Sequence, residues 1–196
     1  MSRTGQPPVL TADMLLAAYA RGRFPMAHDD GMLYWHDPDP RAVFSLATLR
    51  PGPTSRRILR RSPFLTTRDQ AFAEVMRACA DRAETWITEE LIAAYTALHH
   101  QGHAHSVEVW REGALVGGIY GVHLGAAFFG ESMFGRESNA ARVAFLTLAA
   151  HLRERGFQLF DSQYLNDHTA LLGAVEVPRA AFRDRLAQAL HEEAVF

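Results

Sequence analysis

The sequence contains no lysine, so all 20 of its basic residues are arginine, against 22 acidic residues. It has one cysteine, Cys79, which excludes an internal disulfide and a cysteine-rich zinc site. No apolar run reaches the roughly 18 residues that cross a bilayer, and the start, MSRTGQPPVLTADML, lacks the apolar segment of a secretory signal. We therefore expect a cytoplasmic protein without membrane contact, stabilised by packing alone.

The composition is that of an ordinary globular protein, with 48% hydrophobic and 21% charged residues in a chain of 196. Since a domain averages about 150 residues, the chain has room for one core and a small appendage. Residues 23–55 hold five prolines and two glycines, too many breakers for regular helix. We expect a small N-terminal unit, residues 1–40, and a larger domain, residues 41–196.

The net charge of −2 hides an asymmetry, because residues 41–82 carry nine arginines and three acids. Arginine forks match phosphate groups, so a dense cluster is a candidate nucleic-acid contact on an otherwise acidic protein. A solvated loop beside an acidic partner surface fits the charge pattern equally well. The densest part spans twelve residues without an acid and contains Arg50, Arg56, Arg57, Arg60 and Arg61.

Apolar spacing predicts three helices in the first half of the chain. Thr11 is a suitable N-cap for a short helix that ends at Gly22. A capping box that begins at Thr67 precedes a second helix. Thr88 precedes a third, which stops at Gly102.

From His105 onward the pattern changes to alternation, and HSVEVWR, ALVGGIYGVHLG and AAFFGESMF predict three consecutive antiparallel strands. Asn139 then caps a helix, QLFDSQYL predicts a short strand, and a last helix begins at Pro178. Three strands, helix, strand, helix is the order of the N-acetyltransferase superfamily. We therefore expect an α+β fold with an N-acetyltransferase-like mixed sheet, flanked by helices and splayed to admit an acyl donor.

Three polar residues of the predicted strands are site candidates. Glu131 stands in an apolar strand, where a carboxylate is unfavourable unless it is paired, although an outward-facing position would also explain it. Asp161 and Gln163 are two residues apart, so both project from one strand face with Ser162 on the other, and they make a hydrogen-bonding pair. The alternative for this pair is a cap for the turn at Asn166.

Other chemistries find little support in the residues. There is no G-x-S-x-G elbow or Cys/His pair, so covalent catalysis is not expected. Four histidines crowd residues 99–105, but their spacing completes no known zinc pattern, and local packing or bonding is the better explanation. The glycines of LVGGIYG follow neither dinucleotide nor phosphate-loop patterns, so we expect no cofactor and no metal.

Distinctive sequence blocks follow one another over residues 10–183: AYARGRFPM, YWHDPDPRAV, TWIT, LHHQGHAHSVEVW, LVGGIYGV, FFGESMF, DSQYLNDHTALLGA and VPRAAF. Together and in this order, the blocks resemble those of the bacterial leucyl/phenylalanyl-tRNA–protein transferase family. The resemblance implies transfer of leucine, and also phenylalanine or methionine, from aminoacyl-tRNA to the α-amino group of proteins that begin with Arg or Lys. The product is an N-degron that directs proteolysis. A monomer without a cofactor is expected.

The resemblance also implies roles for residues that match the family's motifs. Asp161, Gln163, Glu131 and Asn166 correspond to polar groups at the reacting centre, and Trp86 to a tryptophan near the terminal adenosine. The side-chain pocket corresponds to Ile119, Phe128, Met133, Phe145, Leu148 and Phe160, and the tRNA contact to Arg56, Arg57, Arg60 and Arg61.

Two positions depart from the family pattern, which commonly has an aromatic residue where Met26 stands and a tryptophan where His36 stands. Two alternative functions stay open from the residues themselves: an acetyl-CoA-dependent N-acetyltransferase and a non-enzymatic RNA-binding module. The first needs a glycine-rich turn for pyrophosphate, and FGRESNA has one glycine. The second leaves the acidic and amide residues unused.

Overall fold

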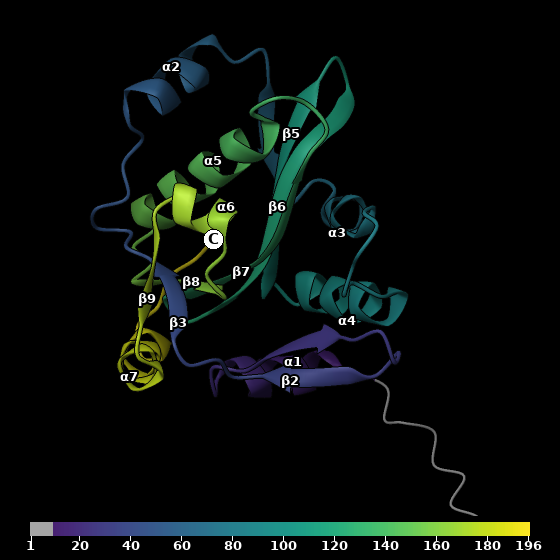
Figure 1. The fold of residues 1–196 in the computed structure, drawn as a ribbon, viewed down its shortest axis with the longest axis vertical. Helices are drawn as coiled ribbons and strands as arrows, with labels where there is room; N and C mark the ends of the chain where they lie inside the picture. The colour runs from purple at the N-terminus through teal and green to yellow at the C-terminus, as the bar shows by residue number, and fades with distance from the viewer. Residues whose placement is uncertain (1–9) are drawn as a thin grey trace, which may run out of the picture.

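Two β-sheets organise residues 10–196, which are the part of the chain described by the computed structural model (Figure 1). A hairpin pairs β1 with β2, and the larger sheet has the strand order β4-β5-β6-β7-β8-β3-β9. Every strand pair is antiparallel except β7 with β8, so the sheet is mixed, as predicted. The strands are β1 (Phe24–Ala27), β2 (Leu33–His36), β3 (Arg41–Phe44), β4 (Leu65–Arg68), β5 (Ala104–Arg111), β6 (Ala114–Leu124), β7 (Ala127–Gly135), β8 (Leu159–Gln163) and β9 (Ala174–Val177).

Helices cover both faces of the central strands, with α5 on one side and α3 and α4 on the other (Figure 1). Glycines in β6 allow this close packing: a Cβ on Gly117 would lie 2.7 Å from the Cβ of Ala140 in α5, and one on Gly118 would lie 3.0 Å from Val75 in α3. The helices are α1 (Ala12–Tyr19), α2 (Pro53–Arg61), α3 (Phe72–Ala80), α4 (Glu89–His100), α5 (Ala140–Glu154), α6 (Asp167–Leu171) and α7 (Arg179–Leu190).

Several predicted helix signals are confirmed. The Thr11 hydroxyl accepts the Met14 N–H at 3.3 Å, and the Thr88 hydroxyl accepts the Leu91 N–H at 3.3 Å. Gly102 follows α4 with φ +80°, a left-handed conformation that glycine adopts without strain. The predicted succession of three antiparallel strands, helix, strand and helix is also present, with α6 and β9 inserted before α7.

The capping box predicted at Thr67 is wrong. Thr67 lies in β4, opposite Glu108 of β5, and its hydroxyl donates to that carboxylate at 2.6 Å. Helix α3 begins at Phe72 without a side-chain cap. Asn139 does precede α5, but in a left-handed conformation (φ +68°) and without a capping hydrogen bond. Sequence reasoning also missed the short strands β1, β2, β3, β4 and β9 and the helices α2 and α6.

The N-terminal helix and hairpin contribute to the same hydrophobic core as the larger sheet. Leu15 and Tyr19 of α1 are fully buried in a cluster that includes Tyr95 of α4 and Phe129 of β7. The division at residue 40 stays a prediction. Within residues 10–196, no helix combines the length and hydropathy that a membrane crossing requires.

Candidate active site

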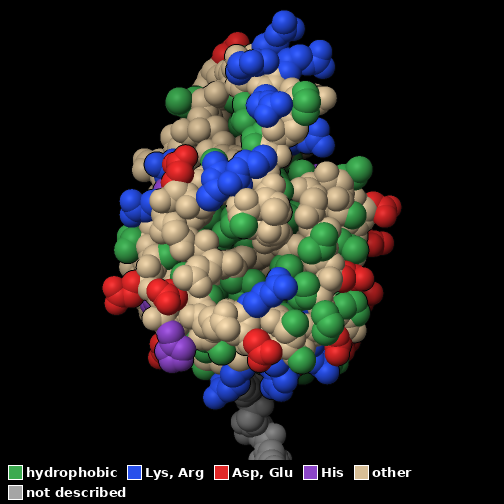
Figure 2. Space-filling model, turned by 90° about the vertical axis from the view of Figure 1, so that its left-hand side faces the viewer, with side chains coloured by type: hydrophobic (Ala, Val, Ile, Leu, Met, Phe, Trp, Pro, Cys, Tyr) green, Lys and Arg blue, Asp and Glu red, His purple; other side chains and the backbone are tan. Residues whose placement is uncertain are grey.

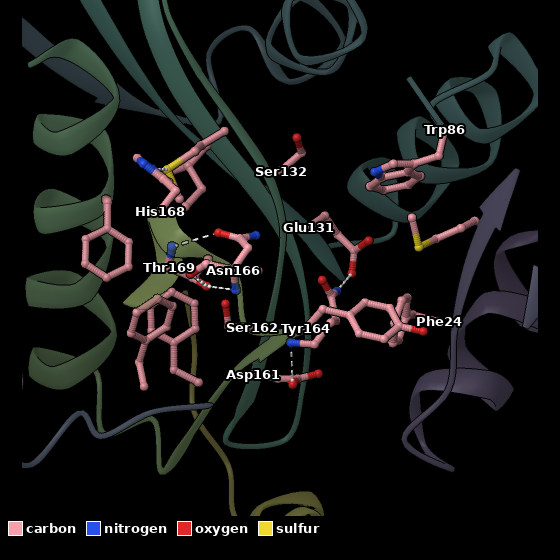
Figure 3. A pocket seen from close by; sticks show the side chains of 18 of the residues that line it. Phe24, Trp86, Glu131, Ser132, Asp161, Ser162, Tyr164, Asn166, His168 and Thr169 are labelled. Carbon is pink, nitrogen blue, oxygen red and sulfur yellow. Dashed lines mark hydrogen bonds between the residues drawn. The ribbon is translucent and has the colours of Figure 1, made fainter. Parts of the chain in front are cut away.

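The cavity that concentrates the predicted site residues lies where β7 and β8 separate. The two strands pair only from Ala127↔Leu159 to Phe129↔Asp161, after which β7 continues to Gly135 paired with β6 alone. A cavity of about 390 Å³ opens at this split, within the range of small-molecule sites. In Figure 3, Trp86 and Asn166 lie on opposite sides of it, with Glu131 between them.

Both strands carry a β-bulge at the cavity. On β7, Gly130 pairs with Gly121 and Ser132 with Tyr120, which leaves Glu131 as the extra residue. On β8, Asp161 pairs with Val43 and Gln163 with Ala42, which leaves Ser162 as the extra residue. A bulge bends its strand and redirects side chains. The prediction that Ser162 faces away is therefore wrong, because Asp161, Ser162 and Gln163 all line the cavity.

A buried ion pair fixes Asp161. The Arg41 guanidinium donates from Nε to Oδ1 at 2.8 Å and from Nη2 to Oδ2 at 2.5 Å, and neither side chain is exposed. Nη1 donates to the Gly22 carbonyl at 2.8 Å, and the guanidinium lies 4.8 Å and 4.4 Å from the ring centroids of Phe24 and Phe182. Burial alone would lower the pKa of Arg41, but the Asp161 carboxylate raises it above its ordinary value.

Asp161 holds the backbone of Gln163, and Glu131 holds its side chain. The Gln163 N–H donates to Asp161 Oδ1 at 3.0 Å, which supports the left-handed backbone of Gln163 at φ +62°. The Gln163 Nε2 donates to Glu131 Oε1 at 2.7 Å. The predicted Asp161–Gln163 hydrogen bond thus exists, but it reaches the main chain. The carboxamide oxygen accepts no hydrogen bond from residues 10–196, and Gln163 is one of the residues that line the cavity.

Two tyrosines surround the Glu131 carboxyl group. Tyr19 of α1 donates to Oε1 at 2.7 Å, and the Tyr95 hydroxyl of α4 lies 3.3 Å from Oε2 and within hydrogen-bond distance of the Tyr19 hydroxyl. Burial raises the pKa of Glu131 to about 8, against the hydrogen bond from Tyr19, which lowers it. Sequence reasoning missed both tyrosines, although each lies on the apolar face of a predicted helix.

The apolar part of the cavity contains most of the predicted pocket residues. Two predicted members lie elsewhere. Phe128 precedes the split and packs in the core against Phe157 and Phe196, with ring centroids 6.2 and 5.8 Å apart. Leu148 lies about one helical turn beyond the cavity on α5 and is buried. The predicted residues that line the cavity are Trp86, Ile119, Met133, Phe145 and Phe160.

Asn166 lines the cavity but is also a helix cap. Its carboxamide oxygen accepts the Thr169 N–H at 2.9 Å, and the Thr169 hydroxyl accepts the Asn166 N–H at 3.0 Å, which makes a reciprocal cap for α6. The oxygen is therefore engaged, and the Nδ2 group is the part of the side chain left for a ligand.

The two departures from the family pattern lie at the hairpin. Met26 lines the cavity, where its thioether gives contact without an aromatic face. His36 stacks on Phe24, with centroids 5.5 Å apart, and its Nδ1 lies 2.7 Å from the Tyr164 hydroxyl. Phe24 and Tyr164 line the cavity, so His36 supports the wall from behind.

The histidines near residue 100 bond locally, as predicted. His105 lies 2.8 Å from Asp69 and 3.0 Å from His123, and His99 contacts the Ala104 carbonyl at 2.8 Å. In the described part of the chain, no group of three or more His, Cys, Asp or Glu residues has the arrangement of a metal site.

The predicted tRNA-contact arginines lie on a helix rather than a loop. Arg56, Arg57, Arg60 and Arg61 belong to α2, are exposed and form no ion pair with residues 10–196. Figure 2 shows their basic side chains gathered at one end of the molecule. The four are absent from the lining of the cavity.

The buried ion pair yields a test by stability. Arg41→Met should lower the free energy of unfolding by about 3 to 5 kcal/mol, because it leaves the Asp161 carboxylate unpaired without water. The control, Arg111→Met, breaks an exposed pair with Glu137 (2.7 Å) and should change stability by less than about 1 kcal/mol. Urea unfolding of both variants measures the difference. Equal losses would contradict a special role for the Arg41–Asp161 pair.

Glu131 predicts a pH dependence of stability. Its pKa, about 8 in the fold against 4.5 ordinarily, means that the folded protein binds the proton more tightly than the unfolded chain. The free energy of unfolding should therefore fall as pH rises from about 4.5 to about 8, by roughly 3 to 5 kcal/mol. Glu131→Gln should flatten this slope in urea unfolding at several pH values, whereas exposed Glu154→Gln should retain it. A slope unchanged by Glu131→Gln would assign it to other groups.

Comparisons with known proteins cover nearly the whole chain. The family model described as leucyl/phenylalanyl-tRNA protein transferase matches residues 43–187, and the model of its N-terminal domain matches residues 9–39. The curated leucyl/phenylalanyl-tRNA–protein transferase of Salinibacter ruber is 53% identical over 94% of this chain and 82% of its own. The one from Gloeobacter violaceus is 50% identical over 92% of this chain and 94% of its own.

A solved structure shows a similar fold at low identity. The crystal structure of FemX has a TM-score of 0.53 at 13% identity and is matched over 85% of this chain. This chain spans 66% of FemX and 56% of L-PGS from Bacillus licheniformis, for which the TM-score is 0.45. The likeness to FemX supports the predicted mixed sheet flanked by helices. The sequence matches support the family as well as the fold. This chain belongs to the leucyl/phenylalanyl-tRNA protein transferase family.

Proposed function

We propose that this protein transfers leucine, phenylalanine or methionine from aminoacyl-tRNA to the α-amino group of proteins that begin with Arg or Lys, creating an N-degron. The observation that carries the proposal is the cavity at the β7–β8 split. It joins an apolar compartment to a fixed carboxamide whose oxygen is open, and it offers no activated nucleophile. Membership of the family supports the same conclusion.

The Ser132 and Thr169 hydroxyls and the Cys79 thiol, near the cavity, lack the partners that activate nucleophiles. Ser132 accepts a hydrogen bond from Arg82, and the Thr169 hydroxyl is used in the α6 cap. His168, the histidine that lines the cavity, contacts the Met133 sulfur at 3.3 Å and no hydroxyl. Burial raises the pKa of the Cys79 thiol to about 12, so the thiolate is not formed.

Aminolysis of an aminoacyl ester needs none of these groups, because the tRNA ester is already activated. The lone pair of the acceptor amine attacks the ester carbonyl, the new N–C bond forms and the C–O bond to the ribose breaks. The proton lost by nitrogen ends on the ribose oxygen, assisted by the neighbouring ribose hydroxyl. The protein contributes by holding a neutral amine against the carbonyl.

Gln163 is placed to orient that amine. An amide is a very weak base, so its carbonyl oxygen accepts an amine N–H hydrogen bond without removing the proton. Glu131 fixes the carboxamide through Nε2, and Asp161 fixes the main chain beneath it. In this proposal Glu131 and Asp161 act through Gln163, and the Nδ2 group of Asn166 is the donor that remains for the substrate.

Amino-acid selection follows from the apolar compartment. Phe145 of α5, Ile119 of β6 and Phe160 of β8 form a preformed wall near the bulges. Side chains unbranched at Cβ, such as Leu, Phe and Met, keep their bulk away from the reacting carbonyl, whereas Ile and Val do not. Since one misplaced methylene is worth only about 1 to 3 kcal/mol, the selection should be graded.

The remaining partners follow from the surroundings of the cavity. Half-buried Trp86 offers an aromatic face for the terminal adenosine, and the α2 arginines offer phosphate contacts for the tRNA body. We also propose that the protein acts as a monomer, and the tRNA substrate implies the cytoplasm.

A transfer assay tests the proposal. The unaltered protein should move labelled leucine from Leu-tRNA to a peptide that begins with Arg. Gln163→Ala should lower kcat by about tenfold or more while tRNA binding changes little, because an orienting group is lost. Exposed Gln158→Ala, just before β8, is the matched control and should keep the full rate. Absence of transfer by the unaltered protein would refute the function, and a normal kcat in a folded Gln163→Ala variant would refute the role.

The α2 arginines should matter only for the tRNA body. Replacing Arg56, Arg57, Arg60 and Arg61 by alanine should weaken Leu-tRNA binding and flatten its salt dependence, since each phosphate contact releases counterions. Transfer from leucyl-adenosine should stay nearly unchanged. Replacing exposed Arg155 and Arg185 gives the control for lost surface charge. Equal losses with both substrates would show that α2 supports the fold instead.

A further inference from the structure

One arginine in the cavity wall has no role in the proposed chemistry. Arg82 follows α3, is exposed, and its Nη2 donates to the Ser132 hydroxyl at 2.9 Å. It is the sole arginine among the residues that line the cavity, and within residues 10–196 it forms no ion pair with a carboxylate. The positive charge of Arg82 is therefore held at the cavity without a carboxylate partner among residues 10–196, and it is available to a ligand.

Arg82 lies on the same connection as Trp86, between α3 and α4, and both residues line the cavity. Trp86 and Ser132, the partner of Arg82, lie along the same side of the cavity in Figure 3, above Glu131. A single segment thus presents an aromatic face and a guanidinium together. These are the two groups that recognise a nucleotide, because a base stacks on the ring and a phosphate pairs with the fork.

The charges around the cavity favour binding of an anion at Arg82 rather than near Glu131 and Asp161, at the two β-bulges. Asp161 is neutralised by its buried pair with Arg41, and the Glu131 carboxyl lies under Tyr19 and Tyr95. The basic side chains of α2 do not reach the cavity lining. A phosphate that enters with the substrate would therefore meet Arg82 as its guanidinium partner.

We propose that Arg82 binds the phosphate group on the 5′ oxygen of the terminal adenosine of aminoacyl-tRNA. The inference rests on the proposed function and adds a substrate contact to it. The ester and the 5′ phosphate leave the ribose from different oxygens, so the ester can lie at Gln163 while the phosphate lies beside Trp86. The Ser132 hydroxyl keeps the guanidinium against β7, which reduces the side-chain freedom lost on binding.

The test compares two minimal substrates that differ only in the phosphate: leucyl-adenosine and leucyl-adenosine 5′-monophosphate. For the unaltered protein, kcat/KM for transfer to an Arg-initiated peptide should be about tenfold or more higher with the phosphorylated substrate, as expected for a charged hydrogen bond. Arg82→Ala should remove this preference and keep the rate with leucyl-adenosine. Arg82→Lys should retain part of it, and Arg185→Ala, far from the cavity lining, should retain all of it.

Each outcome decides the inference. Equal losses with both substrates in Arg82→Ala would show that Arg82 only supports Ser132 and β7, and a preference that survives Arg82→Ala would place the phosphate elsewhere; either result overturns the inference. If the Arg82→Ala variant fails to fold, Arg82→Lys carries the comparison. Equal use of both substrates by the unaltered protein also overturns it while the proposed function stands. Transfer from neither, nor from Leu-tRNA, overturns the proposed function itself.

Discussion

The carboxylate of Asp161 has no exposed surface, and the site depends on how the fold satisfies it. Arg41 neutralises the charge from β3 and at the same time binds the Gly22 carbonyl, which ties the end of α1 to the large sheet. A charge buried without such a partner would be strongly destabilising. The pair therefore stabilises the interior and determines where Gln163 lies. Stability and site geometry are joined in one interaction.

The bulges explain why a regular sheet can hold an irregular site. In a regular strand, the Glu131 side chain would follow the alternation of its neighbours. The bulge instead directs the Glu131 carboxyl group to Tyr19 and Tyr95. On β8, the extra residue lets three consecutive residues line one cavity. Because parallel pairing ends at Phe129 and Asp161, these redirected groups meet across an open space instead of a ladder of hydrogen bonds.

Sequence reasoning predicted what local pattern controls and missed what distant partners control. Alternation after His105 and the spacing of α5 were sufficient for the central strands and their helix, and the motif blocks located Glu131 and Gln163. Arg41 was not predicted as the partner of Asp161 because the two residues are 120 positions apart in the sequence. Strand β3 was not predicted because four residues are too few to show a period. The family resemblance placed Phe128 in the pocket, but a match of motifs does not show where two strands part.

The contacts of α1 have a consequence for how the protein matures on the ribosome. Tyr19 leaves the exit tunnel early, but its partner Glu131 follows 112 residues later, and Arg41 waits 120 residues for Asp161. Contacts between such distant residues form late because long loops must close first. A nascent chain therefore contains Trp86 and the α2 arginines before Glu131 and Asp161 have been synthesised. The contacts that hold Gln163 can form only after β8 has emerged, late in synthesis.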